Sequence, residues 1–151
     1  MRRVALVLIA LLAACAPAPP PPPAKAVADP VTEPWYAPVT AELVALNREA
    51  ESLLRAGKAD DAAATITRGQ ALAARLLTAP SPTLQAMEAA SDNEDQYAGM
   101  LLGNKNLGWA RLSYQKNLSR WKNWRPQSDE TARRIKQAQA GIAECDRRIG
   151  Q

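Results

Sequence analysis

Side chains that commonly carry out catalysis are sparse in this sequence. It contains no histidine, so it has neither a histidine base nor a histidine metal ligand. Two neighbouring carboxylate pairs, Asp60 with Asp61 and Glu94 with Asp95, are the strongest acid–base candidates. Acidic residues are also common in the first turn of a helix, where they cap free N–H groups and face the positive end of the helix dipole. Because no glycine-rich phosphate loop or serine elbow accompanies them, the sequence predicts no enzyme, no metal site and no cofactor.

The first of the two cysteines, Cys15, follows a short apolar run. Arg2 and Arg3 precede the apolar residues 4–12, and small residues follow. A membrane-spanning helix needs roughly 20 apolar residues, so this run is too short to cross a bilayer. A basic start followed by such a run is typical of a secretory signal. We therefore expect residues 1–14 to be a cleaved signal peptide.

The residues around this cysteine resemble a known processing site. Leu12, Ala13, Ala14 and Cys15 are similar to the lipobox of bacterial lipoproteins. The resemblance implies that a signal peptidase cuts before Cys15 and that its sulfur carries a diacylglycerol. An ordinary cleaved signal with an incidental cysteine is the alternative. By the same resemblance, Ala16 favours the outer membrane over the inner membrane, with the domain in the periplasm or, alternatively, at the cell surface.

A proline-rich stretch follows the expected lipid anchor. Residues 16–39 contain nine of the twelve prolines, five of them consecutive, and few charges. Such chain prefers extended polyproline II structure, at about 3.1 Å per residue. A spacer and a proline-rich signalling ligand are both compatible with this composition, and the position next to an anchor favours the spacer. We expect a linker over residues 15–39 and one domain over residues 40–151.

The domain is predicted to be all-α, because apolar residues recur at intervals of three and four and no stretch alternates as a strand would. The predicted helices begin at Thr40, Ala59, Ser81, Leu107 and Ser128. Ser91 and Glu94 resemble a capping box, so the third segment is interpreted as one kinked helix or two helices. Asn106 is expected to cap the fourth helix.

The fifth predicted helix carries a continuous apolar stripe that ends in the second cysteine. The stripe consists of Ile135, Ala138, Ile142, Cys145 and Ile149. Such a stripe is the face that a helix buries, so we expect Cys145 to be buried. Lipidation of Cys15 leaves Cys145 without a partner in its own chain.

Two segments resemble the helical hairpins of tetratricopeptide (TPR) repeat proteins. Residues 46–69 follow the large-small-large, glycine, small-large-small order of that motif, and residues 97–118 are similar. The resemblance implies antiparallel helical hairpins over residues 40–124, with the fifth helix as a C-terminal cap. Ala62 and Ala110 lie farther apart than the roughly 34-residue TPR period, and such arrays usually need about three repeats. Either the long third segment or another chain supplies the missing surface, so a homo-oligomer is one possible arrangement. The alternative to a TPR-like fold is a generic alanine-rich helical bundle.

Basic and aromatic residues gather in the last third of the chain. Residues 104–151 carry eleven basic and four acidic side chains, whereas residues 40–103 carry five and nine. Trp109 lies off the main apolar stripe of the fourth helix, with Lys116 and Arg120 beside it. It is either a contact residue or a side chain that the fifth helix covers, and Trp124 is a further candidate. In the cell envelope, this pattern favours anionic polymers, lipids or acidic proteins over nucleic acid.

Together, these patterns predict a non-catalytic adaptor. The first hypothesis is an outer-membrane lipoprotein, held in the membrane through Cys15, whose helical groove binds an envelope protein or peptide. The candidate contact residues are Trp109, Lys116, Arg120 and Trp124. The alternative hypothesis is a structural tether that holds cell wall or an anionic envelope polymer through the basic aromatic half.

Overall fold

The computed structural model describes residues 29–151, which form one 3-10 turn and five α-helices without a strand. The elements are η1 (Pro30–Thr32), α1 (Tyr36–Arg55), α2 (Ala59–Leu76), α3 (Leu84–Gly103), α4 (Leu107–Asn123) and α5 (Asp129–Ile149). The predicted all-α fold of five helices is therefore confirmed. Across these residues, no helix combines the length and the apolar character needed to span a bilayer. The expected signal peptide, Cys15 and most of the expected linker lie outside the described residues.

The first helix begins four residues earlier than predicted, at Tyr36 rather than Thr40. Pro38 suggested linker, yet it lies in the first turn, where backbone N–H groups have no partner within the helix and proline is tolerated. The Tyr36 side chain is buried, and its hydroxyl accepts a hydrogen bond from the Thr83 backbone N–H at 3.3 Å. A contact with a residue 47 positions away thus fixes the helix start.

The third segment is a single helix, so the alternative of two helices is wrong. Its N-cap is Thr83, whose side chain accepts a hydrogen bond from the Ala86 N–H, and not Ser81. The expected capping box of Ser91 and Glu94 is also wrong. Ser91 lies within α3, and its hydroxyl accepts a 2.7 Å hydrogen bond from the Trp121 indole N–H. The serine at position 91 therefore serves a tertiary contact, although its type and position in the sequence suggested a helix start.

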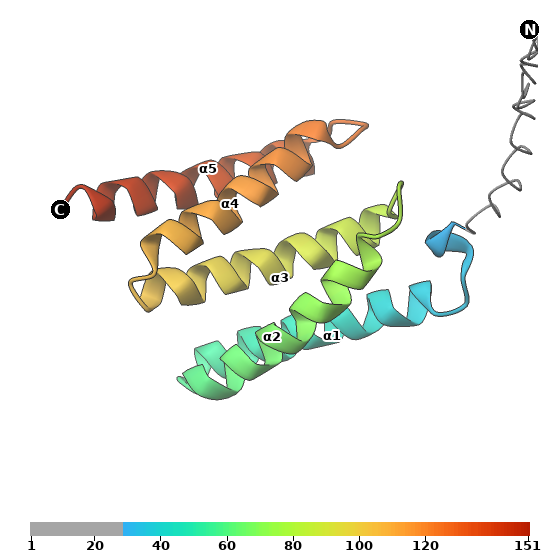
Figure 1. Ribbon diagram of the computed structural model, residues 1–151, viewed down its shortest axis with the longest axis horizontal. Helices are drawn as coiled ribbons and strands as arrows, with labels where there is room; N and C mark the ends of the chain where they lie inside the picture. Colours follow the sequence, from blue (N-terminus) through green and yellow to red (C-terminus); the bar gives the residue numbers. More distant parts are fainter. Residues whose placement is uncertain (1–28) are drawn as a thin grey trace, which may run out of the picture.

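The helices form antiparallel hairpins that stack side by side (Figure 1). The helix α3 packs against α1, α2 and α4, and α4 packs against α5. At the crossing of α2 and α3, a Cβ atom on Gly69 would lie 2.2 Å from the Asn93 amide nitrogen. That amide donates hydrogen bonds to the Asn47 side chain and to the Ile66 carbonyl, and so joins three helices. Small residues and buried amides thus set the spacing of the stack.

The last helix covers α4, and its start agrees with the sequence. Ser128 caps α5 in a reciprocal capping box with Thr131, as expected from its position. Cys145 is fully buried, which confirms that prediction, whereas Ile149 at the end of the stripe is 55% exposed. Asn106 occupies the predicted N-cap position of α4, but its side chain makes no capping hydrogen bond.

The first turn of α5 also predicts a pH effect. Hydrogen bonds from Arg133 and Arg134 lower the pKa of Glu130 from 4.5 to about 2. A lowered pKa in the folded state stabilises the fold above the unfolded pKa, and this contribution is lost as the pH falls from about 4.5 towards 2. We expect Glu130→Gln to be less stable at neutral pH by no more than about 1 kcal/mol, since the pair is largely exposed.

Thermal melting at stepwise lower pH measures this difference between Glu130→Gln and the unchanged chain. The difference in melting temperature should disappear as the pH falls from about 4.5 towards 2. Glu49→Gln is the matched control, because Glu49 is exposed and makes no ion pair among the described residues. A gap that stays constant down to acidic pH would rule out the assigned ionisation.

Candidate functional site

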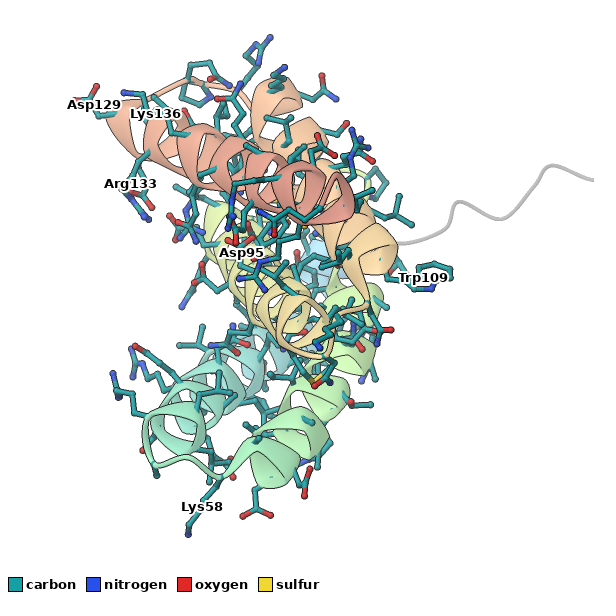
Figure 2. All side chains as sticks on the ribbon, turned by 90° about the vertical axis from the view of Figure 1, so that its left-hand side faces the viewer. Lys58, Asp95, Trp109, Asp129, Arg133 and Lys136 are labelled. Carbon is teal, nitrogen blue, oxygen red and sulfur yellow. The ribbon has the colours of Figure 1, made fainter. Side chains whose placement is uncertain are left out.

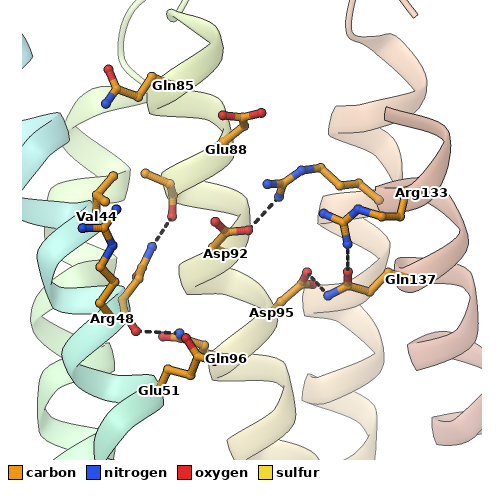
Figure 3. A pocket seen from close by; sticks show the side chains of 13 residues that line it. Val44, Arg48, Glu51, Gln85, Glu88, Asp92, Asp95, Gln96, Arg133 and Gln137 are labelled. Carbon is orange, nitrogen blue, oxygen red and sulfur yellow. Dashed lines mark hydrogen bonds and ion pairs between the residues drawn. The ribbon is translucent and has the colours of Figure 1, made fainter. Parts of the chain in front are cut away.

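A groove of about 620 Å³ lies between α1, α3 and α5 (Figure 3). The helix α3 forms the floor of the groove, and α1 and α5 form its two walls. The lining residues are Val44, Asn47, Arg48 and Glu51 from α1, Gln85, Glu88, Ala89, Asp92, Asp95 and Gln96 from α3, and Arg133, Arg134 and Gln137 from α5.

The polar floor of the groove follows from residue spacing on α3. Gln85, Glu88, Asp92 and Asp95 are separated by three, four and three positions, which places them on one helical face. Ala86, Ala90 and other small residues on the remaining faces are buried against the neighbouring helices. The helix therefore turns its polar stripe towards the groove and its small residues towards the core.

Ion pairs link the floor to the α5 wall. The Arg134 guanidinium lies 2.7 Å from an Asp92 oxygen and 2.7 Å from a Glu130 oxygen. Gln137 donates a 2.9 Å hydrogen bond to Asp95, whose other oxygen accepts one from Asn117 at 2.7 Å. Figure 3 shows the ion pair of Asp92 and the hydrogen bond between Gln137 and Asp95. Most charge on this side of the groove is thus held in place by defined partners.

Burial sets the protonation behaviour of the floor. Desolvation raises the pKa of Asp95 above its ordinary value, while the hydrogen bond from Asn117 acts in the opposite direction. Asp92 and Glu94 nearby add like charge, which also raises the pKa. A cationic group entering the groove would stabilise the ionised carboxylate that burial disfavours.

Two charged groups remain open to a ligand. Arg48 on α1 and Glu88 on α3 line the groove and make no ion pair among the residues described. The Gln96 Oε1 atom nearby is buried and has no hydrogen-bond partner there. Figure 3 shows Arg48 and Glu88 on the α1 wall and the α3 floor respectively. The groove therefore offers a cation on one wall and an anion on its floor. In residues 29–151, no cluster of three metal-binding side chains is present. These groups are suited to recognising the backbone and charged side chains of a peptide.

None of the four contact residues expected from the sequence lines this groove. Trp109 in the first turn of α4 is 68% exposed and points away from the domain (Figure 2), so the alternative that α5 covers it is wrong. The charged ends of Lys116 and Arg120 lie 3.5 and 3.7 Å from the two oxygens of Glu94. Trp124 is half-buried against Trp121, with ring centroids 6.2 Å apart.

The structure places Arg120 beside both Lys116 and Trp124, whereas Trp109 stands apart from them. Trp109 and Trp124 stand at opposite ends of α4, roughly 22 Å apart along the helix axis. Arg120 and Trp124 line a second hollow of about 500 Å³, beside the α2–α3 connection. Its full lining is Pro80, Ser81, Pro82, Met87, Arg120, Asn123, Trp124 and Arg125. The candidate contact residues Trp109 and Trp124 therefore lie on two separate surfaces.

The sequence did contain a signal for the groove. The polar stripe of α3 from Gln85 to Asp95 has helical spacing, but Glu94 and Asp95 were interpreted as residues of a first helical turn. That interpretation holds for Asp60 and Asp61, which lie in the first turn of α2. It is wrong for Glu94 and Asp95, which lie in the middle of α3.

Comparison with known proteins adds no family to this geometry. Protein-family models, curated proteins and solved structures gave no match to the chain.

Proposed function

We propose that this protein is an outer-membrane lipoprotein, anchored through Cys15, whose helical domain is a non-catalytic adaptor for an envelope protein or peptide. The observation that carries the proposal is the groove between α1, α3 and α5, with free charges on a wall and on the floor. Three helices line the groove, and most of the lining side chains are polar. Its ligand would be an extended segment that presents backbone groups and charged side chains.

The stacking of the helices supports the proposed TPR-like character. In the described domain, α3 packs against both helices of the preceding hairpin and against its own partner, α4. The first helix of each hairpin then lines the same groove, together with α5. This regular use of alternate helices is the arrangement from which repeat domains build extended binding surfaces.

The alternative of a tether for wall or anionic polymers draws less support from the contacts. It depends on the basic aromatic half of the chain, and two of the cations there, Lys116 and Arg120, are directed at Glu94 of the same chain. Trp109 remains exposed, but these two cations, which were expected beside it, are engaged in ion pairs.

Photocrosslinking in intact cells tests the proposed function. A photoreactive phenylalanine analogue replaces Gln85, an exposed groove residue, or Lys136, an exposed residue of α5 outside the groove. We expect a discrete adduct with one envelope protein from position 85 and none from position 136. Equal adducts from both positions, or no adduct from position 85, would count against a binding groove.

The same cells test the anchor through Cys15→Ser. We expect the unchanged chain and its adduct to sediment with outer membranes, because the lipid on Cys15 holds them there, and Cys15→Ser to be recovered in the soluble fraction. If Cys15→Ser sediments like the unchanged chain, the membrane attachment has another origin.

A further inference from the structure

The second hollow has a composition that the groove lacks. Trp124 and Met87 provide an aromatic and a flexible apolar surface, and Pro80 and Pro82 complete the apolar rim. The hollow is polar only through Ser81, Asn123 and two arginines, and no carboxylate stands among its described lining residues. On the helical wheel of α3, Met87 lies on nearly the opposite side from the groove residues Gln85 and Asp92. The hollow and the groove are therefore separate sites on different faces.

The hydrogen-bonding capacity of the hollow is dominated by donors. The guanidinium groups of Arg120 and Arg125 carry five N–H groups each. Arg120 also lies 3.7 Å from Glu94, and the described partners of both arginines use only some of these groups. The Asn123 amide adds two more N–H groups. A matching ligand therefore supplies acceptors and apolar rings, and it has no need of donors of its own.

Polyproline has this chemistry. A prolyl residue has a carbonyl acceptor and no backbone N–H, and its ring packs against aromatic side chains in grooves that recognise polyproline II helices. The helix is extended before binding, so little conformational entropy is lost when it docks. The sequence holds five consecutive prolines at positions 19–23, and the adaptor function uses them for nothing beyond spacing.

The described chain begins next to this hollow. The Tyr36 hydroxyl, near the start of α1, accepts a hydrogen bond from Thr83, which directly follows the lining residue Pro82. Val31 packs on the core cluster that contains Ala79, which directly precedes the lining residue Pro80. Figure 1 shows the start of α1 and the α2–α3 and α4–α5 connections at one end of the molecule.

We propose that the hollow at Trp124 is a binding site for a polyproline II segment, and that its occupant is residues 19–23 of the same chain. Five residues lie between position 23 and Asp29, and the six steps along the chain allow a reach of roughly 19 Å in extended form. Because a short tether gives an effective concentration of about millimolar, even a weak contact is well populated. If the proposed anchor at Cys15 holds, docking draws the domain towards the membrane, and release lets it move outward.

A paramagnetic label tests the proposal in the whole chain. Cys15→Ser with Ala18→Cys places a single reactive thiol beside the prolines, since Cys145 is fully buried, and a nitroxide is attached to it. The indole N–H signals of Trp124 and Trp109 are compared with the label oxidised and reduced. We expect Trp124 to be attenuated at least about twofold more than Trp109, because the docked state is well populated. Trp109, at the far end of α4, is the internal control.

A matched variant separates docking from simple proximity. Pro19→Gly, Pro20→Ser, Pro21→Gly, Pro22→Ser and Pro23→Gly keep the tether length and remove the polyproline helix. We expect this change to lower the attenuation at Trp124 to the level at Trp109, and a free peptide of residues 16–28 to shift the Trp124 signal of the variant. Equal attenuation at Trp124 before and after the change would overturn the proposal. So would a free peptide that binds at Trp124 of the unchanged chain when the label shows no contact within it, because the occupant would then be another chain.

Discussion

Replacing Trp121 by alanine is expected to lower the free energy of unfolding by about 3–5 kcal/mol, the usual cost of removing a fully buried large aromatic side chain. Trp121 is 1% exposed, and its indole N–H donates to the buried Ser91 hydroxyl at 2.7 Å. Its ring also packs under the Arg134 guanidinium, 4.9 Å from the ring centroid. The substitution therefore removes packing between α4, α3 and α5 together. Urea unfolding followed by far-ultraviolet circular dichroism measures the change.

Trp109 provides the matched control, because it is the same residue type on the same helix. It is 68% exposed, so Trp109→Ala should change stability by no more than about 0.5 kcal/mol. Trp121→Phe keeps most of the ring volume and removes the hydrogen bond to Ser91, so its cost should fall between the two. Equal losses for Trp121→Ala and Trp109→Ala would mean that the packing of α4 described above is wrong.

Gly69→Ala is expected to destabilise the domain by about 1–3 kcal/mol, although alanine is the better helix former. The added methyl group would lie 2.2 Å from the Asn93 amide nitrogen and 3.2 Å from a Leu43 methyl carbon. To make room, the Asn93 amide would have to leave its hydrogen bonds to Asn47 and Ile66. Thermal melting and urea unfolding should both report the loss.

Gly99→Ala should act in the opposite direction. Gly99 is exposed within α3, and an added Cβ atom meets nothing within 4 Å. The substitution should stabilise the domain by about 0.5–1 kcal/mol through helix propensity alone. A stabilising effect of both substitutions would contradict the close approach of α2 and α3 at Gly69.

The helices were predictable because their signals are local. Leu43, Leu46 and Ala50 repeat at helical spacing, and Gly57, with φ of 72°, adopts the left-handed conformation that follows a helix end. The start of α1 was not predictable in this way, because Tyr36 is held by Thr83 from a distant part of the sequence. Local patterns therefore located the helices but misplaced a boundary that a tertiary contact determines.

The groove was harder to predict than the helices, since three separate segments form it. Arg48, Asp92 and Arg133 come from three different helices, and no sequence interval relates them. The polar stripe on α3 was visible, but its partner walls were not. The exposure of Trp109 could not be predicted either. Its position off the apolar stripe can be seen in the sequence, whereas its exposure depends on where α5 packs.

The buried amides of Asn47 and Asn93 have a consequence for alternative packings of the same helices. Asn47 donates to the Ala89 carbonyl at 2.8 Å and accepts from Asn93 at 3.1 Å, while its own carbonyl accepts from Gln96. If α3 slid by one residue along α1, these amides would be buried without partners, at a cost of about 1–3 kcal/mol for each group. An alanine-rich surface alone would tolerate such sliding, because neighbouring positions are similar in size and shape. The buried amides therefore determine the register of the helices. They contribute little net stability to the correct alignment, but they make shifted alignments unfavourable.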